Sequence, residues 1–97
     1  RDSSMTSKAK KLLERMRRSK SDWSAKDLIH LYEGFGFQVT HGANHDIVKH
    51  TKYLNLRTTL PRHSVLARGY VEFAVKLIDQ LFVIEKQEQD HGSEDRS

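Results

Sequence analysis

Four of the six histidines in the chain lie between residues 41 and 63: His41, His45, His50 and His63. An imidazole gains and loses a proton near neutral pH and is a common metal ligand, so this group suits either proton transfer or zinc binding. Along a continuous strand His41 and His45 would lie ~13 Å apart, too far to share one ion, although a turn between them shortens the gap. Because the chain has no cysteine to strengthen a zinc site, we expect no metal.

Two short motifs carry the candidate chemistry. In Gly42-Ala43-Asn44-His45, Gly42 and Asn44 tolerate the positive φ of a turn, and His45 then begins a strand. In Pro61-Arg62-His63, Pro61 has no N–H to donate and ends a later strand. His45 is the first candidate for acid–base chemistry. His63 either shares the acid and base roles with it or only contacts phosphate. The candidate phosphate-binding cations are Lys49, Arg57 and Arg62.

Length and composition limit the class of protein. The chain has 97 residues, enough for one compact domain and too few for two. It has no cysteine and no apolar run near the roughly 20 residues of a membrane span, so we expect a cytoplasmic protein without a membrane partner. The sequence contains no phosphate-binding Gly-Lys loop and no Gly-x-Ser-x-Gly elbow, and we expect no small-molecule cofactor.

The net charge of +4 is unevenly distributed along the chain. In residues 1–20 eight basic residues face two acidic ones, whereas residues 85–97 are mainly acidic. An excess of positive charge favours an anionic partner. Residues 1–21 form a basic extension that could contain a short helix. Three interpretations stay open for it: an RNA arm, a partner-docking helix or a solvated tail.

Hydrophobic spacing predicts the elements of the domain at residues 22–84. Ser24 and Asp27 fit the start of a helix over residues 24–34, and Gly34 can supply its left-handed stop. Strands are expected at residues 37–41, 45–49 and 54–60, and a wide apolar stripe predicts a helix over residues 70–84. The fold class is therefore α+β, with the order α-β-β-β-α, a three-stranded antiparallel sheet and two helices on one face. The polar segment 85–97 is expected to be disordered.

The orientation of His45 depends on the strand register. In a regular strand His45, Ile47 and Lys49 share one face, so a buried Ile47 would bring His45 toward the core. A bulge near Asn44 would then be needed to point His45 outward, and the register stays open. In the third strand the residues expected on the core face are Leu54, Leu56 and Leu60.

With these motifs the chain resembles the HicA family of bacterial toxins. In that family a Gly-Ser-Asn-His or Gly-Ser-His-His turn places a histidine at the start of the second strand, as His45 is placed here. A strand that ends in Pro-x-His follows, which Pro61-Arg62-His63 matches, and Gly36-Phe37 matches the preceding helix end. The resemblance spans residues 27–79. The chain departs from the family at Ala43, where serine is customary, and at Glu72, where a basic residue is frequent.

The resemblance implies a fold similar to double-stranded-RNA-binding domains, metal-independent endoribonuclease activity on mRNA, and inhibition by a HicB-type antitoxin protein. Cleavage of RNA needs a group that accepts the 2′-hydroxyl proton and cations that neutralise developing charge. On this interpretation His45 is the catalytic group and Lys49 or Arg57 lies beside the phosphate. Two alternatives are a catalytically inactive RNA-binding domain and an interaction module that receives an antitoxin.

Overall fold

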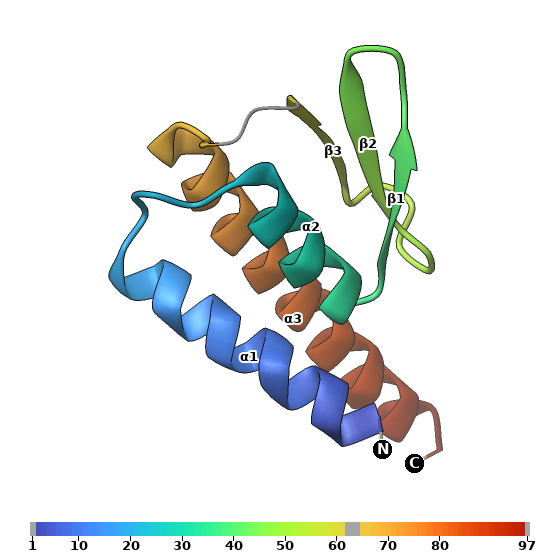
Figure 1. Cartoon of the computed structure of the whole chain (residues 1–97). Helices are drawn as coiled ribbons and strands as arrows, with labels where there is room; N and C mark the ends of the chain where they lie inside the picture. Colours follow the sequence, from blue (N-terminus) through green and yellow to red (C-terminus); the bar gives the residue numbers. More distant parts are fainter. Residues whose placement is uncertain (1, 62–64, 97) are drawn as a thin grey trace.

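The chain folds in three layers, in the order α-α-β-β-β-α. The structure is a computed structural model that describes the backbone of residues 2–61 and 65–96 and the side chains of residues 8–61 and 65–89. A three-stranded antiparallel sheet in the order β1-β2-β3 forms one layer, and α2 and α3 cover one of its faces (Figure 1). Helix α1 contacts α2 and α3 and forms the third layer, away from the sheet. The predicted α+β class is confirmed. No described helix is long and apolar enough to cross a membrane.

Helix α1 (Asp2–Arg18) is part of the hydrophobic core. Ala9, Leu13 and Met16, spaced four and three residues apart, are buried against the other helices, and Met16 has no exposed surface. Arg17 fastens the helix to α3, because its two terminal nitrogens lie 2.6 and 3.2 Å from the Asp79 carboxylate. The interpretation of this segment as a solvated tail is therefore wrong: it docks, and it docks on its own domain.

Helix α2 (Ala25–Gly34) begins as the sequence predicts and ends differently. The Ser24 hydroxyl accepts from the Asp27 backbone N–H at 3.1 Å, and the Asp27 carboxylate accepts from the Ser24 N–H at 3.0 Å, which completes a capping box. At the C-terminal end of this helix the residue with positive φ is Gly36, at 93°, and not Gly34. Gly34 instead allows α1 to approach, because a Cβ there would lie 2.5 Å from the Cβ of Ala9.

The sheet is regular and its strands are short. Strands β1 (Phe37–His41) and β2 (His45–His50) are close to their predicted bounds, whereas β3 (Arg57–Pro61) begins later than expected. Buried His50 explains the late start: its Nδ1 accepts from the backbone N–H groups of Lys52 and Tyr53, which folds the segment before β3 into turns. Leu54 is consequently 61% exposed and does not share the core face with Leu56 and Leu60, as had been predicted.

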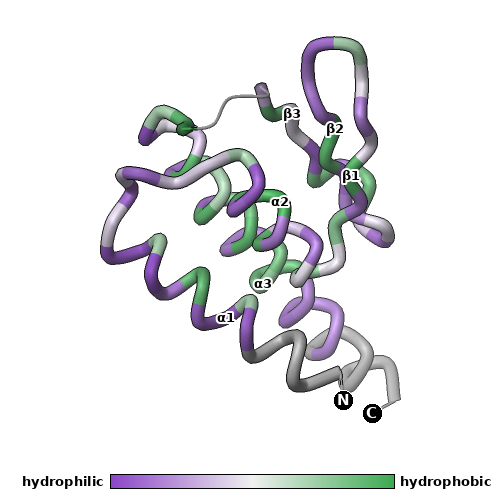
Figure 2. The backbone as a smooth tube through the Cα atoms, in the orientation of Figure 1, coloured by the Kyte–Doolittle hydropathy of each residue, from purple (hydrophilic) through white to green (hydrophobic). Residues whose placement is uncertain are grey.

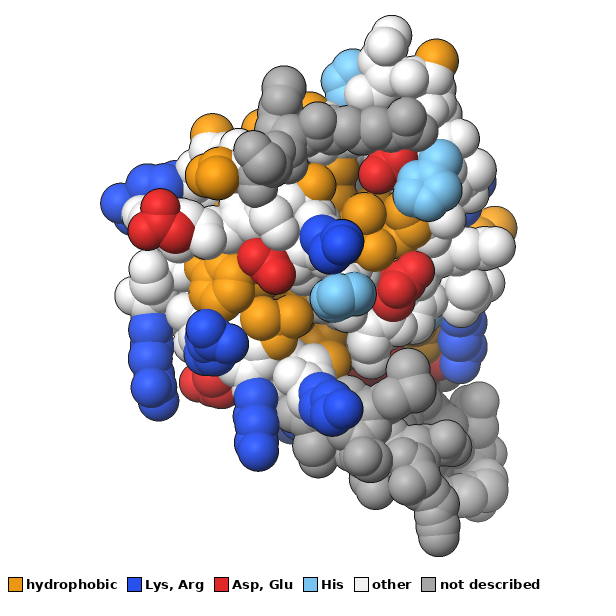
Figure 3. Space-filling view, viewed as in Figure 1, with side chains coloured by type: hydrophobic (Ala, Val, Ile, Leu, Met, Phe, Trp, Pro, Cys, Tyr) orange, Lys and Arg blue, Asp and Glu red, His pale blue; other side chains and the backbone are white. Residues whose placement is uncertain are grey.

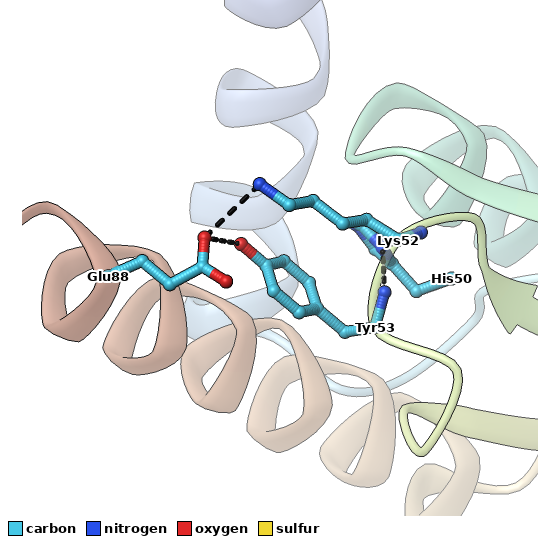
Figure 4. Close-up of polar contacts among 4 residues, drawn as sticks. All are labelled: His50, Lys52, Tyr53 and Glu88. Atoms are coloured by element: carbon cyan, nitrogen blue, oxygen red, sulfur yellow. Dashed lines mark hydrogen bonds and ion pairs between the residues drawn. The ribbon is translucent and has the colours of Figure 1, made fainter. Parts of the chain in front are cut away.

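Helix α3 (Arg68–Arg96) is much longer than the predicted residues 70–84. The expectation of disorder from residue 85 is wrong for the helical backbone, which continues to Arg96. A tertiary contact supports the extension: Glu88 accepts from the Tyr53 hydroxyl at 2.7 Å and from the Lys52 ammonium at 3.1 Å (Figure 4). These hydrogen bonds raise the pKa of Lys52 and lower that of Glu88.

The core lies between the sheet and the helices. The hydrophobic residues of the helices lie on the sides that face one another, whereas the outer sides of α1 and α2 carry hydrophilic residues (Figure 2). The largest fully buried side chains come from all three layers: Tyr32, Met16, Leu28, Leu31, Leu60, Ile78, Leu81, Val48 and Val71. Burial raises the pKa of the Tyr32 hydroxyl, which has no hydrogen-bond partner among the described residues. One continuous core therefore includes α1.

Candidate nucleic-acid interface

One face of the sheet is left uncovered by the helices. Along β2 burial alternates, so that Asp46, Val48 and His50 are buried while the residues between them are exposed. The same alternation on the neighbouring strands defines what we term the open sheet face. Its members, all exposed, are Gln38 and Thr40 of β1, His45, Ile47 and Lys49 of β2, and Arg57 and Thr59 of β3.

His45 points outward without the bulge that had been considered. The pairing between β1 and β2 is regular up to His41 and Asp46, and Ile47 is exposed and not in the core. Ile47 therefore lies on the open sheet face beside His45, and the hydrophobic core forms without its side chain. The premise of a buried Ile47 was wrong because residues 46, 48 and 50 provide the core side of this strand.

The turn before His45 is tight. The backbone N–H of Gly42 donates to the carbonyl oxygen of His45 at 2.9 Å, and a Cβ at Gly42 would lie 2.8 Å from that oxygen. Glycine is thus needed here for close approach. Neither Gly42 nor Asn44 has a positive φ, contrary to the expectation for this turn. Asn44 is exposed at the tip, where it leaves His45 accessible.

Lys49 and Arg57 are direct partners across β2 and β3 on the open sheet face. Directly opposite residues of antiparallel strands have Cβ atoms about 5 Å apart, and like charges so placed repel each other. Both side chains are exposed, and neither has an ion-pair partner among the described residues. An anion bound between them would relieve the repulsion, so this pair is suited to a phosphate.

The second motif ends beside the same turn. Pro61 closes β3, as predicted, and is the Cα partner of His45. Arg62 and His63, the remaining candidates from that motif, lie outside the described residues. The structure thus brings His45, Lys49 and Arg57 together on one face, with His45 about 13 Å along β2 from Lys49.

A carboxylate-oriented histidine was missed by the sequence reasoning, which weighed His41 only as a metal ligand. The His41 Nδ1 lies 2.9 Å from the Oδ1 of Asp46, its Cα partner across the hairpin. The Asp46 side chain is 5% exposed and that of His41 is 70% exposed. The signal that could have found this pair is the spacing itself, since a hairpin with four residues, 42–45, between them places residues 41 and 46 opposite each other.

The three histidines described between residues 41 and 50 do not converge on one point. Buried His50 accepts two backbone N–H groups at Nδ1, and its Nε2 lies 3.2 Å from the Phe35 carbonyl oxygen, which makes it a structural residue. Within the described parts of the chain no three His, Asp or Glu side chains come together as a metal site would require.

The fold and this face define an α+β domain with one bare, cation-bearing face on a three-stranded antiparallel sheet. No family model matches the chain, and searches of curated proteins and of solved structures return no match either. Function must therefore be argued from the open sheet face.

Proposed function

We propose that this chain is an endoribonuclease that cleaves mRNA without a metal ion, and that His45 is its catalytic residue. The observation that carries the proposal is the shared position of His45, Lys49 and Arg57 on the open sheet face. An exposed imidazole and an opposed pair of cations on one flat surface offer a proton acceptor and a phosphate site to one strand of RNA.

The chemistry needs few groups. The 2′-hydroxyl oxygen attacks the neighbouring phosphorus, a bond from O2′ to phosphorus forms, and the bond from phosphorus to O5′ breaks. In this proposal the His45 imidazole accepts the 2′-hydroxyl proton, a water molecule donates a proton to the departing O5′, and the products are a 2′,3′-cyclic phosphate and a 5′-hydroxyl end. Lys49 and Arg57 neutralise negative charge on the phosphates of the RNA strand. The attraction between each cation and a phosphate becomes stronger as the bound RNA excludes water from the open sheet face.

The biological setting is part of the same proposal. The turn and Pro-Arg-His motifs resemble those of HicA toxins, so we propose a cytoplasmic toxin of a type II toxin–antitoxin system with a HicB-type antitoxin as its partner. An antitoxin that covered the open sheet face would block RNA and bury Ile47, an exposed hydrophobic residue at the centre of that face.

Cleavage of single-stranded RNA in the presence of EDTA tests the proposal. The wild-type chain is expected to cleave, and His45→Ala to lose about 10²-fold or more of the rate, the usual contribution of a general base. Gln80→Ala is the control, because Gln80 is exposed on α3 and lies off the open sheet face. Equal cleavage by wild type and His45→Ala would overturn the assignment.

A catalytically inactive RNA-binding domain is the second candidate. It is favoured by one observation: the His45 imidazole has no hydrogen-bond partner among the described residues, whereas catalytic bases are commonly oriented by a third group. Salt-dependent RNA binding with no turnover above the His45→Ala background would support this candidate, and absence of binding at low salt would reject it.

A further inference from the structure

Helix α1 carries a second line of positive charge. Lys8, Lys11, Arg15 and Arg18 are all exposed and follow one another at intervals of three, four and three residues, which places them on one side of the helix. We term these four residues the α1 stripe. At 1.5 Å of rise per residue it is about 15 Å long. Lys and Arg side chains flank the part of the surface that α1 occupies (Figure 3).

Three of the four residues of the α1 stripe, Lys8, Lys11 and Arg18, take no part in holding α1 to the domain, whereas Arg15 lies over the Trp23 ring. Docking uses the opposite side of the helix, through Leu13 and Met16, and the ion pair of Arg17 with Asp79. Among the described residues Lys8, Lys11 and Arg18 have no ion-pair partner. Glu14 is the one acidic residue among the described side chains of α1. Four neighbouring cations on one side of a helix repel one another, and an anionic ligand bound there would relieve that repulsion.

Two hollows lie beside the stripe along the seam between α1 and α2. The first, of about 450 Å³, is edged by Lys8, Lys11 and Arg15 and also by Glu33. The second, of about 600 Å³, is edged by Arg15, Arg18 and Trp23 and also by Asp22 and Asp27, so in both hollows the cations lie on the α1 side and the carboxylates on the other. The Arg15 guanidinium lies 5.2 Å from the centre of the Trp23 ring. Cations that alternate with an aromatic ring are the usual means of holding nucleic-acid strands through phosphates and bases.

The lining favours RNA over a protein partner. The hydrophobic residues that line the two hollows are Ala9, Leu12 and Trp23, of which Ala9 is buried and the other two are half-buried. Stable protein interfaces bury about 800 Å² on each partner around a hydrophobic centre, and this seam offers little of that. A phosphate backbone needs only the cations.

We propose that the α1 stripe is a second RNA-backbone contact surface, which raises affinity for long RNA without entering the chemistry at the open sheet face. This inference rests on the proposed function for the identity of the anion. The layer of α2 and α3 separates α1 from the sheet, in a molecule of 50 × 29 × 27 Å. Only an RNA long enough to pass around the helices reaches both surfaces.

The test compares two variants with the same loss of charge. The stripe variant combines Lys8→Gln, Lys11→Gln, Arg15→Gln and Arg18→Gln. The control combines Lys26→Gln, Arg68→Gln, Lys76→Gln and Lys86→Gln, which are exposed positions on α2 and α3. Binding is measured with 2′-O-methyl RNA of about 6 and about 30 nucleotides across a range of KCl concentrations. Because this RNA lacks a free 2′-hydroxyl, the result does not depend on turnover and stands even if the chain proves not to be a nuclease.

For the long RNA the stripe variant is expected to lose about tenfold or more in affinity, and its slope of log affinity against log salt to fall by ~0.7 per lost phosphate contact. Its binding of the short RNA, and its rate of cleavage of a short substrate, are expected to match wild type. If the fourfold variant unfolds, the single variants Lys8→Gln and Lys11→Gln replace it in the test. Each is expected to lower the salt slope by ~0.7.

Equal losses in the stripe variant and the control would overturn the proposal, since charge alone would then explain them. Loss of polyglutamate binding by the stripe variant, with unchanged affinity for the long RNA, would also overturn it and assign the α1 stripe to an acidic protein segment.

Discussion

Successive side chains of β2 point to opposite faces of the sheet, and this alternation decides which of them are buried. Asp46, Val48 and His50 face the helices, and the residues between them face solvent, so the imidazoles of His45 and His50 have opposite roles although they lie on one strand. His50 is satisfied and structural, whereas His45 is free to meet a ligand. Parity along the strand thus decides which of the two histidines is buried and structural and which is exposed.

Two glycines allow a prediction at the residue scale. Gly36→Ala is expected to destabilise the fold by about 1–2 kcal/mol, because a side chain is strained at φ 93° and its Cβ would lie 3.0 Å from the His50 ring. Gly69→Ala is expected to stabilise by up to about 1 kcal/mol, because Gly69 lies in the first turn of α3 with open space around it. Urea unfolding of both variants checks the opposite signs, and a shift in the same direction would contradict the explanation.

At the scale of elements, the long α3 is held by the loop before β3. Lys52 and Tyr53 reach across to Glu88, four residues beyond the end of the helix predicted from its apolar stripe. The hydrogen bond from Tyr53 is the largest cause of the lowered pKa of Glu88. A group with a lowered folded-state pKa stabilises above its unfolded-state pKa, and that stabilisation is lost as the pH falls through the folded-state value.

Glu88→Ala is therefore expected to speed amide hydrogen exchange in residues 51–56 at neutral pH. Acidification of the wild type through the lowered pKa of Glu88 is expected to reduce the protection of the same amides relative to their intrinsic exchange rates at that pH, because protonated Glu88 no longer pairs with Lys52. Glu85→Ala is the matched control, since Glu85 is exposed on the same helix and has no hydrogen bond or ion pair to the loop among the described residues. Identical exchange in the two variants would show that Glu88 does not fasten the loop.

At the scale of the whole molecule, α1 and the sheet belong to one cooperative unit. Met16 has no exposed surface and joins a hydrophobic cluster that continues through α2 and α3 to Val48 and Leu60 of the sheet. In a close-packed core, removal of one buried side chain lowers the stability of the whole packed unit. The N-terminal helix therefore contributes to the stability of the surface that carries His45.

Met16→Ala is expected to lower the free energy of unfolding by about 2–5 kcal/mol, the usual cost of truncating a buried methionine. Circular dichroism and Trp23 fluorescence should report one common transition, whereas Lys10→Ala, on the exposed side of α1, should leave it unchanged within about 0.5 kcal/mol. Met16→Leu should cost less than about 1.5 kcal/mol. Two separate transitions would show that α1 unfolds independently.

Several features could be predicted from the sequence because neighbours in the chain decide them. The capping box of Ser24 and Asp27, the bounds of β1 and the apolar stripe of α3 depend on spacing over a few residues, and the structure confirms each. The α+β class followed from the order of those elements. Spacing alone also placed His45 and Lys49 on one face of a strand, which is how the candidate site was found.

Side-chain contacts decided the rest. The docking of α1 and the contact of Glu88 join segments far apart in the chain. The turns at His50 and the pair of His41 with Asp46 join residues only two to five apart, through polar contacts that hydrophobic spacing does not register. The sequence by itself determined which segments form helices and strands, because spacing over a few residues is a local property, whereas the start of β3 and the end of α3 differ from the bounds expected from it. Only the tertiary structure decided which side of each is buried, because burial depends on what packs against it, and that choice left His45, Lys49 and Arg57 exposed together.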